Sequence, residues 1–217
     1  TNVELTDRLI ASESGISADK LKGKLKMTQE EWQILEKSIT RLVKAPLYID
    51  ETPGITLAEF VAKSKRLVRE KGVEIIFVDY LQLMRSHTKQ AQNSREREIA
   101  EISGGLKALA KELKIPIVVL AQLNRGPENR TGKNKGTPMM SDLRESGAIE
   151  QDADMIGLLW RSKYYAEDDE EREQVGNDAN LLLAKNRNGP TGDVPLTFHA
   201  EIMRFVTRIP AEGDEEE

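Results

Sequence analysis

The stretch Glu74-Ile-Ile-Phe-Val-Asp-Tyr-Leu-Gln-Leu-Met84 decides the fold that we expect for this chain. Its apolar run, 75–78, is typical of a strand that is buried on both faces in the middle of a parallel sheet. Asp79 follows at the C-terminal end of this strand, where open α/β sheets bind their ligands. A polar residue at the edge of a core is the ordinary alternative for Asp79, and the other motifs decide between the two.

The composition places the chain among globular proteins of one sizeable domain or two small ones. The 217 residues are 38% hydrophobic and 32% charged, and no apolar run approaches the roughly 20 residues that span a bilayer. We therefore expect a cytoplasmic protein without a membrane partner. The absence of Cys excludes disulfides, Cys-bound zinc and thiol nucleophiles, and only two His argue against a His-based metal site.

Charge is unevenly distributed along the chain. The tail 212–217 holds five acids, and removing them from the net charge of −5 leaves residues 1–211 close to neutral. The segment 125–135 is a basic loop, whereas 167–173 is strongly acidic. Any nucleic-acid contact must therefore come from local basic loops, because the total charge offers no attraction for phosphate.

Apolar spacing and capping residues predict alternating strands and helices. Helices are expected at 2–14, 28–44, 56–71 and 95–113, with a short basic link at 17–27 and a short helix within 143–152. Strands are expected at 46–50, 75–78, 115–121, 154–160, 181–184, 194–198 and 203–207. Long loops are expected at 85–94 and 123–142. This order predicts an α/β fold with a mostly parallel sheet flanked by helices, and with the last three strands antiparallel at its edge.

Two polar residues follow the two central strands. If those strands are neighbours, Asp79 and Gln122 emerge at the same edge of the sheet. A carboxylate there can hold Mg²⁺ through its water shell, and a Gln can contact a phosphate or position a water molecule. Because many α/β folds end their strands on polar residues, the pair alone is only moderately specific.

Two further segments carry groups suited to phosphate. Lys185 and Arg187 alternate on an expected strand and therefore face the same way, although charges on an edge strand often serve only to prevent aggregation. In the segment 141–154, Arg144 with the small Ser146 and Gly147 allows a phosphodiester chain to approach the backbone. A polar helix with internal ion pairs is the alternative for that segment.

The sequence lacks the Gly-x-x-x-x-Gly-Lys-Ser/Thr motif that cradles phosphates. Gly132-Lys133-Asn134 looks like a fragment of it, but no Ser or Thr follows the Lys and no strand leads into it. The phosphate cradle expected beside Asp79 is therefore not found in these 217 residues.

Four motifs, in this order, closely resemble the DnaB family of bacterial replicative helicases. They are Ile-Ile-Phe-Val-Asp79-Tyr-Leu-Gln-Leu-Met, Leu-Ala-Gln122-Leu-Asn-Arg, Ser-Asp-Leu-Arg144-Glu-Ser-Gly-Ala-Ile-Glu-Gln-Asp-Ala-Asp, and Ala-Lys185-Asn-Arg187-Asn-Gly-Pro-Thr-Gly. The resemblance implies a RecA-like, P-loop NTPase fold that is N-terminally truncated, because it begins after the family's P-loop and after the strand that bears its catalytic glutamate. We expect 1–211 to be a partial motor domain and 212–217 to be a disordered acidic tail.

The resemblance also implies roles in binding ATP and Mg²⁺. Asp79 would hold Mg²⁺, and Gln122 would link the γ-phosphate to the DNA loops. Lys185 and Arg187 would act in trans on the ATP of the adjacent subunit, and Arg8 would lie near the base. Glu51 does not match the family's catalytic glutamate.

Single-stranded DNA is the implied substrate. The loop 85–94 would face the central channel. The residues expected to bind DNA are Arg144, Glu145 and Gly147, with Arg125 and Arg130 from the basic loop. The resemblance further implies a homo-hexamer, with primase and a helicase loader as partners.

The missing motifs leave alternatives open. A chain without the P-loop lysine and the catalytic glutamate is not expected to hydrolyse ATP by itself. It is then part of a longer protein, the product of a split or intein-interrupted gene, or a degenerate paralogue. A non-catalytic DNA-binding or regulatory module of the same fold and a recombinase-like ATPase are the rival functions, and the run Asp142-Leu-Arg-Glu-Ser-Gly147 disfavours the recombinase.

Overall fold

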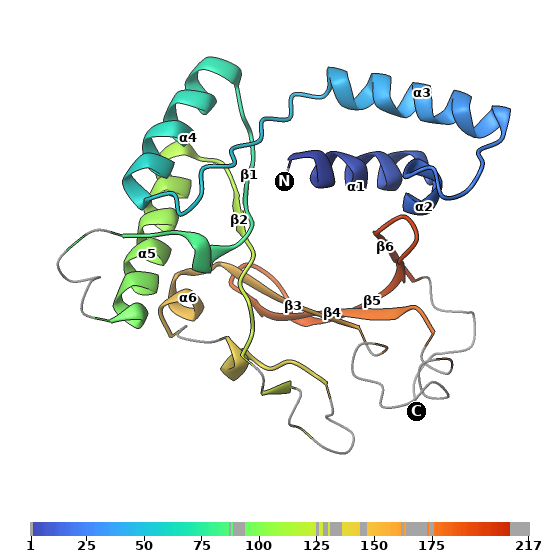
Figure 1. Cartoon of the computed structure of the whole chain (residues 1–217). Helices are drawn as coiled ribbons and strands as arrows, with labels where there is room; N and C mark the ends of the chain where they lie inside the picture. Colours follow the sequence, from blue (N-terminus) through green and yellow to red (C-terminus); the bar gives the residue numbers. More distant parts are fainter. Residues whose placement is uncertain are drawn as a thin grey trace. The chain divides into compact units, whose positions relative to one another are not determined.

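The structure is a computed structural model that describes residues 2–86, 88, 94–124, 126, 127, 130, 136–143, 147–161, 163, 173 and 176–208. The α-helices are α1 (Asn2–Ser14), α2 (Ala18–Leu21), α3 (Gln29–Lys44), α4 (Leu57–Lys71), α5 (Arg95–Leu113) and α6 (Gly147–Asp152). Two 3-10 helices are η1 (Leu81–Leu83) and η5 (Met140–Asp142). The strands are β1 (Ile76–Val78), β2 (Ile117–Val119), β3 (Met155–Arg161), β4 (Asp178–Asn186), β5 (Gly192–His199) and β6 (Arg204–Thr207). Figure 1 shows these elements along the chain.

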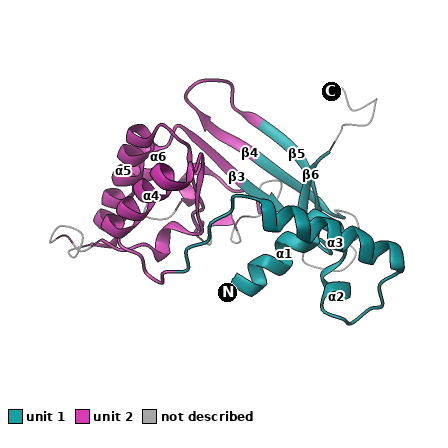
Figure 2. Cartoon of the chain, turned by 90° about the horizontal axis from the view of Figure 1, so that it is seen from above, with its two compact units in different colours: residues 1–51, 159–181, 193–217 teal, residues 52–158, 182–192 magenta. Residues whose placement is uncertain are grey.

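The chain divides into two compact units (Figure 2). Residues 52–158 and 182–192 form one unit, and residues 1–51, 159–181 and 193–217 form the other. Strands β3 and β4 have residues in both. The single motor domain over 1–211 stays a prediction, and the predicted tail 212–217 lies outside the described residues.

The unit that contains residues 52–158 is built around a parallel strand pair. β1 and β2 pair with Ile76 opposite Ile117 and Val78 opposite Val119, and α5 connects them as the crossover helix. The cluster of buried side chains beside this pair is Val78, Leu81, Met84, Ile99, Ile102 and Leu106. The predicted 95–113 helix is thus confirmed, and its apolar stripe supplies half of this core.

The prediction that the central strands are buried on both faces is wrong for this structure. Val78 is only 8% exposed, but Phe77 is 65% exposed and its register partner Val118 is 42% exposed. Side chains alternate across a strand, so Phe77 and Val118 share the face opposite Val78. An apolar run shows that a strand tolerates burial on both faces, but it does not reveal which faces other elements cover.

Capping residues set the helix boundaries as the sequence predicts. Thr28 and Thr56 each accept a hydrogen bond from the backbone N–H three residues on, and Glu31 and Glu59 complete the two capping boxes. Gly72 ends α4 in the left-handed conformation at φ 65°, which glycine adopts without steric cost. Each N-cap is worth about 1 kcal/mol.

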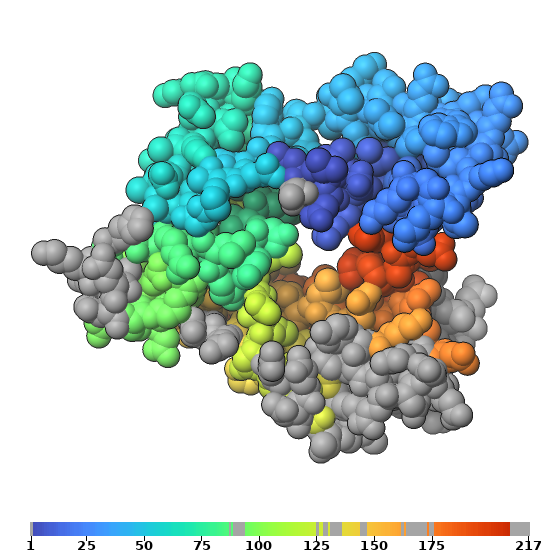
Figure 3. Space-filling model, viewed as in Figure 1, coloured from blue at the N-terminus to red at the C-terminus, as the bar shows by residue number. Residues whose placement is uncertain are grey.

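In the other unit, α1 packs against α3, and the space-filling view shows the two helices in close contact (Figure 3). The buried residues on these helices are Ala11, Leu35 and Ser38, whereas Trp32 of the predicted apolar stripe is 57% exposed. The predicted strand at 46–50 is wrong, because this segment has no ladder partner in the described structure and its side chains are exposed.

Strands β3, β4, β5 and β6 form a sheet in that order. β5 and β6 are antiparallel, as predicted for the end of the chain, with Phe198 opposite Phe205 and their ring centroids 4.6 Å apart. The Arg161 guanidinium lies over the Phe198 ring at 4.4 Å. Within the described part of the chain, no helix has the length and apolar character needed to cross a bilayer.

Candidate nucleotide site and nucleic-acid interface

The parallel pairing of β1 and β2 brings Asp79 and Gln122 to one edge of the strand pair, as predicted. Asp79 directly follows β1, and Gln122 comes three residues after β2. The backbone continues the pairing past the strand ends, because Leu81 N–H donates to the Leu120 carbonyl at 2.9 Å. Both residues therefore lie beyond the carboxyl ends of parallel strands, the usual ligand position in α/β sheets.

Gln82 connects the two strand ends, and the sequence reasoning did not single it out. Its side-chain amide donates to the Gln122 carbonyl and accepts from the Gln122 N–H, each at 3.3 Å. This two-point contact fixes the backbone of Gln122 relative to η1. The residue was visible in the quoted stretch 74–84, but nothing in the sequence indicates which backbone group a glutamine will contact.

Asp79 is exposed, and among the described residues its carboxylate has no hydrogen-bonding or ionic partner. A free carboxylate at this edge fits the expected Mg²⁺ site, because Mg²⁺ keeps most of its waters and uses few protein carboxylates. The described residues contain no cluster of three acidic or His side chains that would hold a metal without such help.

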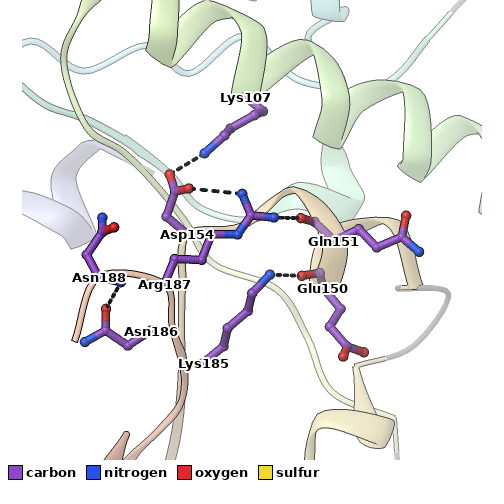
Figure 4. Close-up of polar contacts among 8 residues, drawn as sticks. All are labelled: Lys107, Glu150, Gln151, Asp154, Lys185, Asn186, Arg187 and Asn188. Carbon is purple, nitrogen blue, oxygen red and sulfur yellow. Dashed lines mark hydrogen bonds and ion pairs between the residues drawn. The ribbon is translucent and has the colours of Figure 1, made fainter. Parts of the chain in front are cut away.

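Lys185 and Arg187 lie at the end of β4 and face the same way, as their alternation predicts; both reach the end of α6. The Lys185 ammonium donates to the Glu150 carbonyl, and the Arg187 guanidinium donates to the carbonyl of Gln151 (Figure 4). These carbonyls belong to the last turn of α6, whose C-terminal groups lack partners within the helix. The negative end of the helix dipole favours both cations there.

Asp154 joins the Arg187 backbone and side chain to α5. The Arg187 N–H donates to the Asp154 carbonyl at 2.9 Å, its guanidinium lies 3.5 Å from the Asp154 carboxylate, and Lys107 binds the same carboxylate (Figure 4). The hydrogen bond from Lys107 holds the pKa of Asp154 below its ordinary value, with Arg187 and Lys111 adding attraction against the cost of desolvation. Sequence reasoning missed Asp154, which closes the quoted motif 141–154.

The helix α6 is itself fixed to α5. The Ser103 hydroxyl donates to the Asp152 carboxylate at 2.7 Å, and Ile149 packs against the core of this unit. α6 therefore presents its last carbonyls from a supported position. Its first residue is Gly147, one of the predicted DNA-binding residues.

Arg130 of the basic loop is engaged by a buried acid. Its guanidinium donates to both carboxylate oxygens of Asp142 at 2.7 Å each, and Asp142 is 3% exposed. Burial opposes ionisation of Asp142, but hydrogen bonds from Arg130 and from the Met139 N–H outweigh it and lower the pKa of the carboxyl. The same pairing raises the pKa of Arg130.

The other predicted site residues are only partly described. Arg125, Arg144 and Glu145 lie outside the described residues, so their DNA contacts stay predictions. Arg8 lies on α1, in the compact unit that does not contain Asp79, and its contact with a nucleotide base also stays a prediction.

Fold and site together define an α/β domain with acid and amide groups at the carboxyl edge of a parallel strand pair, the edge at which α/β sheets bind ligands, and with two cations at the end of another strand. The family model of the DnaB-like helicase C terminal domain matches residues 1–207. The chain belongs to this family.

Two curated relatives are named as replicative DNA helicases. The replicative DNA helicase DnaB of Geobacillus stearothermophilus is 44% identical over 204 residues, and the replicative DNA helicase DnaC of Bacillus subtilis (strain 168) is 43% identical over 204 residues. Each alignment covers 94% of this chain but only 43% of the relative. The chain thus spans less than half the length of these helicases.

Solved structures agree with the predicted α/β RecA-like fold class. One structure, described as an ATPase domain, has a TM-score of 0.83 and 35% identity, with 96% of this chain and 72% of that chain covered. A second, described as a DnaB-like replicative helicase and its interactions with primase, has a TM-score of 0.80 and 35% identity, with 92% and 46% covered.

Proposed function

We propose that this chain is part of a hexameric replicative helicase that couples ATP hydrolysis to movement along single-stranded DNA and to duplex unwinding at the replication fork. Its family and the names of its relatives support this proposal. The observation that carries it is the parallel pairing of β1 with β2, which puts Asp79 and Gln122 at one edge. The DnaB-like family match leaves the recombinase-like alternative without support.

ATP and Mg²⁺ are the proposed cofactors. Asp79 is the residue that would hold Mg²⁺ through its water shell, and Gln122 is the residue that would contact the terminal phosphate. When bound, Mg²⁺ neutralises the charge that develops on the phosphates. The chain's own contribution is a free carboxylate and an amide whose backbone Gln82 fixes.

Lys185 and Arg187 are proposed to act on the nucleotide of an adjacent subunit. Their side chains share a direction at the end of β4, and Arg187 remains 47% exposed although it contacts Asp154. Arg binds phosphate with two parallel hydrogen bonds, whereas Lys supplies a compact charge. The pair therefore suits the stabilisation of charge on a transferring phosphoryl group.

The proposed DNA interface lies around the start of α6. Gly147 opens α6, and the proposed contacts of Arg144 and Glu145 lie immediately before it in the sequence. Aromatic residues are only 5% of the chain, so phosphate contacts are expected to dominate over base stacking. Binding is then tolerant of sequence and weakens with salt.

The replacement Arg144→Ala tests this interface. We expect it to weaken binding of a labelled single-stranded oligonucleotide and to lower the salt slope of log K by about 0.7, the loss for one phosphate contact. Fluorescence anisotropy over a salt series measures both. Arg69→Ala, at an exposed residue of α4, is the control for losing one charge, and an affinity for Arg144→Ala equal to that control refutes the assignment.

Partners and location are also proposals. Primase is a proposed partner because the second solved neighbour is described with primase. A ring of six copies and a helicase loader rest on the resemblance of the motifs alone. The cytoplasm is the proposed location, since bacterial DNA is replicated there.

A non-catalytic DNA-binding module is the second candidate, favoured by the absence of a P-loop motif in these 217 residues. The two proposals differ in what Asp79→Asn does in an assembly that contains a P-loop. A helicase subunit loses Mg²⁺-dependent ATP hydrolysis at its own site, whereas a non-catalytic module keeps both its DNA affinity and the activity of the assembly.

A further inference from the structure

Asp142 is buried and its partner Arg130 is partly exposed, and this pair lies next to the proposed DNA interface in the sequence. Among the described residues, the groups that the pair binds belong to one loop. Besides the two 2.7 Å contacts with Asp142, the Arg130 guanidinium donates to the Thr137 carbonyl at 2.7 Å. Its side chain is 22% exposed, and that of Asp142 is 4% exposed. Three of the guanidinium's hydrogen bonds are thus used within the loop.

Asp142 holds both ends of this loop. Its carboxylate accepts from the Met139 N–H at 2.7 Å, and its carbonyl accepts from the Asn124 N–H at 2.7 Å. Leu143, the next residue, forms an isolated bridge with Leu123. Asp142 therefore ties the start of the loop, just after β2, to its end, just before Arg144 in the sequence.

Gly126 completes the arrangement because it leaves room for the carboxylate. A Cβ at this position would lie 2.5 Å from Oδ1 of Asp142 and 2.7 Å from Oδ1 of Asn124. The Gly126 N–H donates to Asn124 Oδ1 at 2.7 Å. A side chain at 126 would therefore push the Asp142 carboxylate out of place without changing any charge.

We propose that Arg130 and Asp142 form a clamp that anchors the chain at Leu143, the residue before the proposed DNA-binding residues in the sequence, and that Arg130 supports DNA binding through Asp142 instead of contacting phosphate. This inference rests on the proposed DNA interface at Arg144–Gly147. A guanidinium that already makes a two-point contact with a buried carboxylate would have to give up that contact to bind phosphate, leaving the Asp142 charge buried and unpaired. The clamp holds the backbone of Asp142 and Leu143, the last two residues before Arg144 in the sequence.

The two roles for Arg130 make opposite predictions for Asp142→Asn. If Arg130 binds phosphate, removal of a competing negative charge leaves DNA affinity unchanged or tightens it. If the clamp positions the segment, Asp142→Asn weakens binding although it removes a negative charge, by about tenfold, the equivalent of one charge-assisted hydrogen bond. Asp19→Asn, at an exposed residue of α2 that is also paired with a cation, Lys24, is the matched control.

Two further variants, Arg130→Lys and Gly126→Ala, distinguish the geometry of the contact between Arg130 and Asp142 from the charge of Arg130. Lys keeps the charge that a phosphate contact needs but loses the two-point contact, so the clamp predicts a loss of affinity close to that of Arg130→Met. Gly126→Ala changes no charge and is also expected to weaken binding. In all three variants the salt slope stays within about 0.3 of the wild-type value, because no phosphate contact is lost.

The experiment is anisotropy of a labelled single-stranded oligonucleotide with the full chain, over a salt series, with circular dichroism to confirm folding of each variant. Unchanged affinity in both Asp142→Asn and Gly126→Ala, or a salt slope lowered by about 0.7 in Arg130→Met, overturns the clamp.

Failure of the proposed function gives a different result, because the wild-type chain would then not bind the oligonucleotide at all. The positioning role of Arg130 in DNA binding would be refuted by the same result. Hydrogen exchange at the Met139 and Asn124 amides still decides whether Arg130 holds the loop. Faster exchange in Arg130→Lys is expected, and equal exchange refutes even that contact.

Discussion

Asp142 is a buried acid whose protonation is expected to lower the stability of the fold. Its folded pKa lies below the ordinary 3.8, since hydrogen bonds from Arg130 and Met139 outweigh burial. A lowered folded pKa means that the contribution of Asp142 to stability is present above its unfolded pKa and is lost as the pH falls through the folded pKa. Carboxyl groups of this kind are a main source of acid denaturation.

We therefore expect the free energy of unfolding to drop between about pH 6 and about pH 3, and to drop less in Asp142→Asn. Urea unfolding at both pH values measures the difference. Asp193→Asn, an exposed acid on β5, controls for the change of one charge. A pH dependence in Asp142→Asn as steep as in the wild type would show that the pair contributes nothing.

Single residues also show what sequence reasoning can and cannot reach. Asp79 and Gln122 were found because the ends of neighbouring parallel strands must share an edge. Gln82 and Asp154 were missed because their partners are backbone groups or distant side chains, such as Gln122 and Lys107. Contacts of this kind depend on packing between elements, which periodicity does not report.

At the scale of elements, α5 carries two adjacent glycines in different surroundings. A Cβ at Gly105 would lie 2.5 Å from Cδ2 of Leu57 on α4, whereas a Cβ at Gly104 would meet only Asp152 Oδ2, at 3.9 Å. Gly105 thus permits the close approach of α4 to α5. Gly104 has no such contact and costs the helix backbone entropy.

We expect Gly105→Ala to destabilise the protein by about 1–3 kcal/mol and Gly104→Ala to stabilise it by about 0.5–1 kcal/mol. Both variants make the same chemical change one residue apart in α5, so each controls for the other. Thermal and urea unfolding measure the two effects. Equal shifts of the same sign would mean that contact between α4 and α5 does not depend on Gly105.

Some helix and strand predictions were right and others were wrong, for physical reasons. The capping box at Thr28 and the N-cap at Thr56 were predicted because a local side-chain contact fixes a helix start. The strand at 46–50 was wrong because a strand needs a partner that its own sequence does not specify. The exposed face of Phe77 was missed for the same reason.

At the scale of the whole molecule, the residues proposed to contact nucleotide fall into two sets. Asp79 and Gln122 lie at the edge of β1 and β2, and the pair Lys185 and Arg187 lies at the end of β4, held by the last carbonyls of α6. We propose that one set serves the chain's own nucleotide and the other serves that of a neighbour. The sequence motifs predicted both sets, but only the structure shows that α6 joins the cations to Gly147.

The trans action of Arg187 is tested most directly by the ATP hydrolysis rate of a mixed assembly. The chain is combined with a P-loop-bearing relative whose own finger arginine has been replaced, so that hydrolysis requires a cation from this chain. The wild-type chain is expected to restore hydrolysis, and so is the control Arg204→Ala, which changes an exposed residue of β6. Arg187→Ala is expected to leave the hydrolysis rate lower than that of the wild type by a factor of about 10³ or more. Restoration by Arg187→Ala equal to that by the wild type would contradict the account.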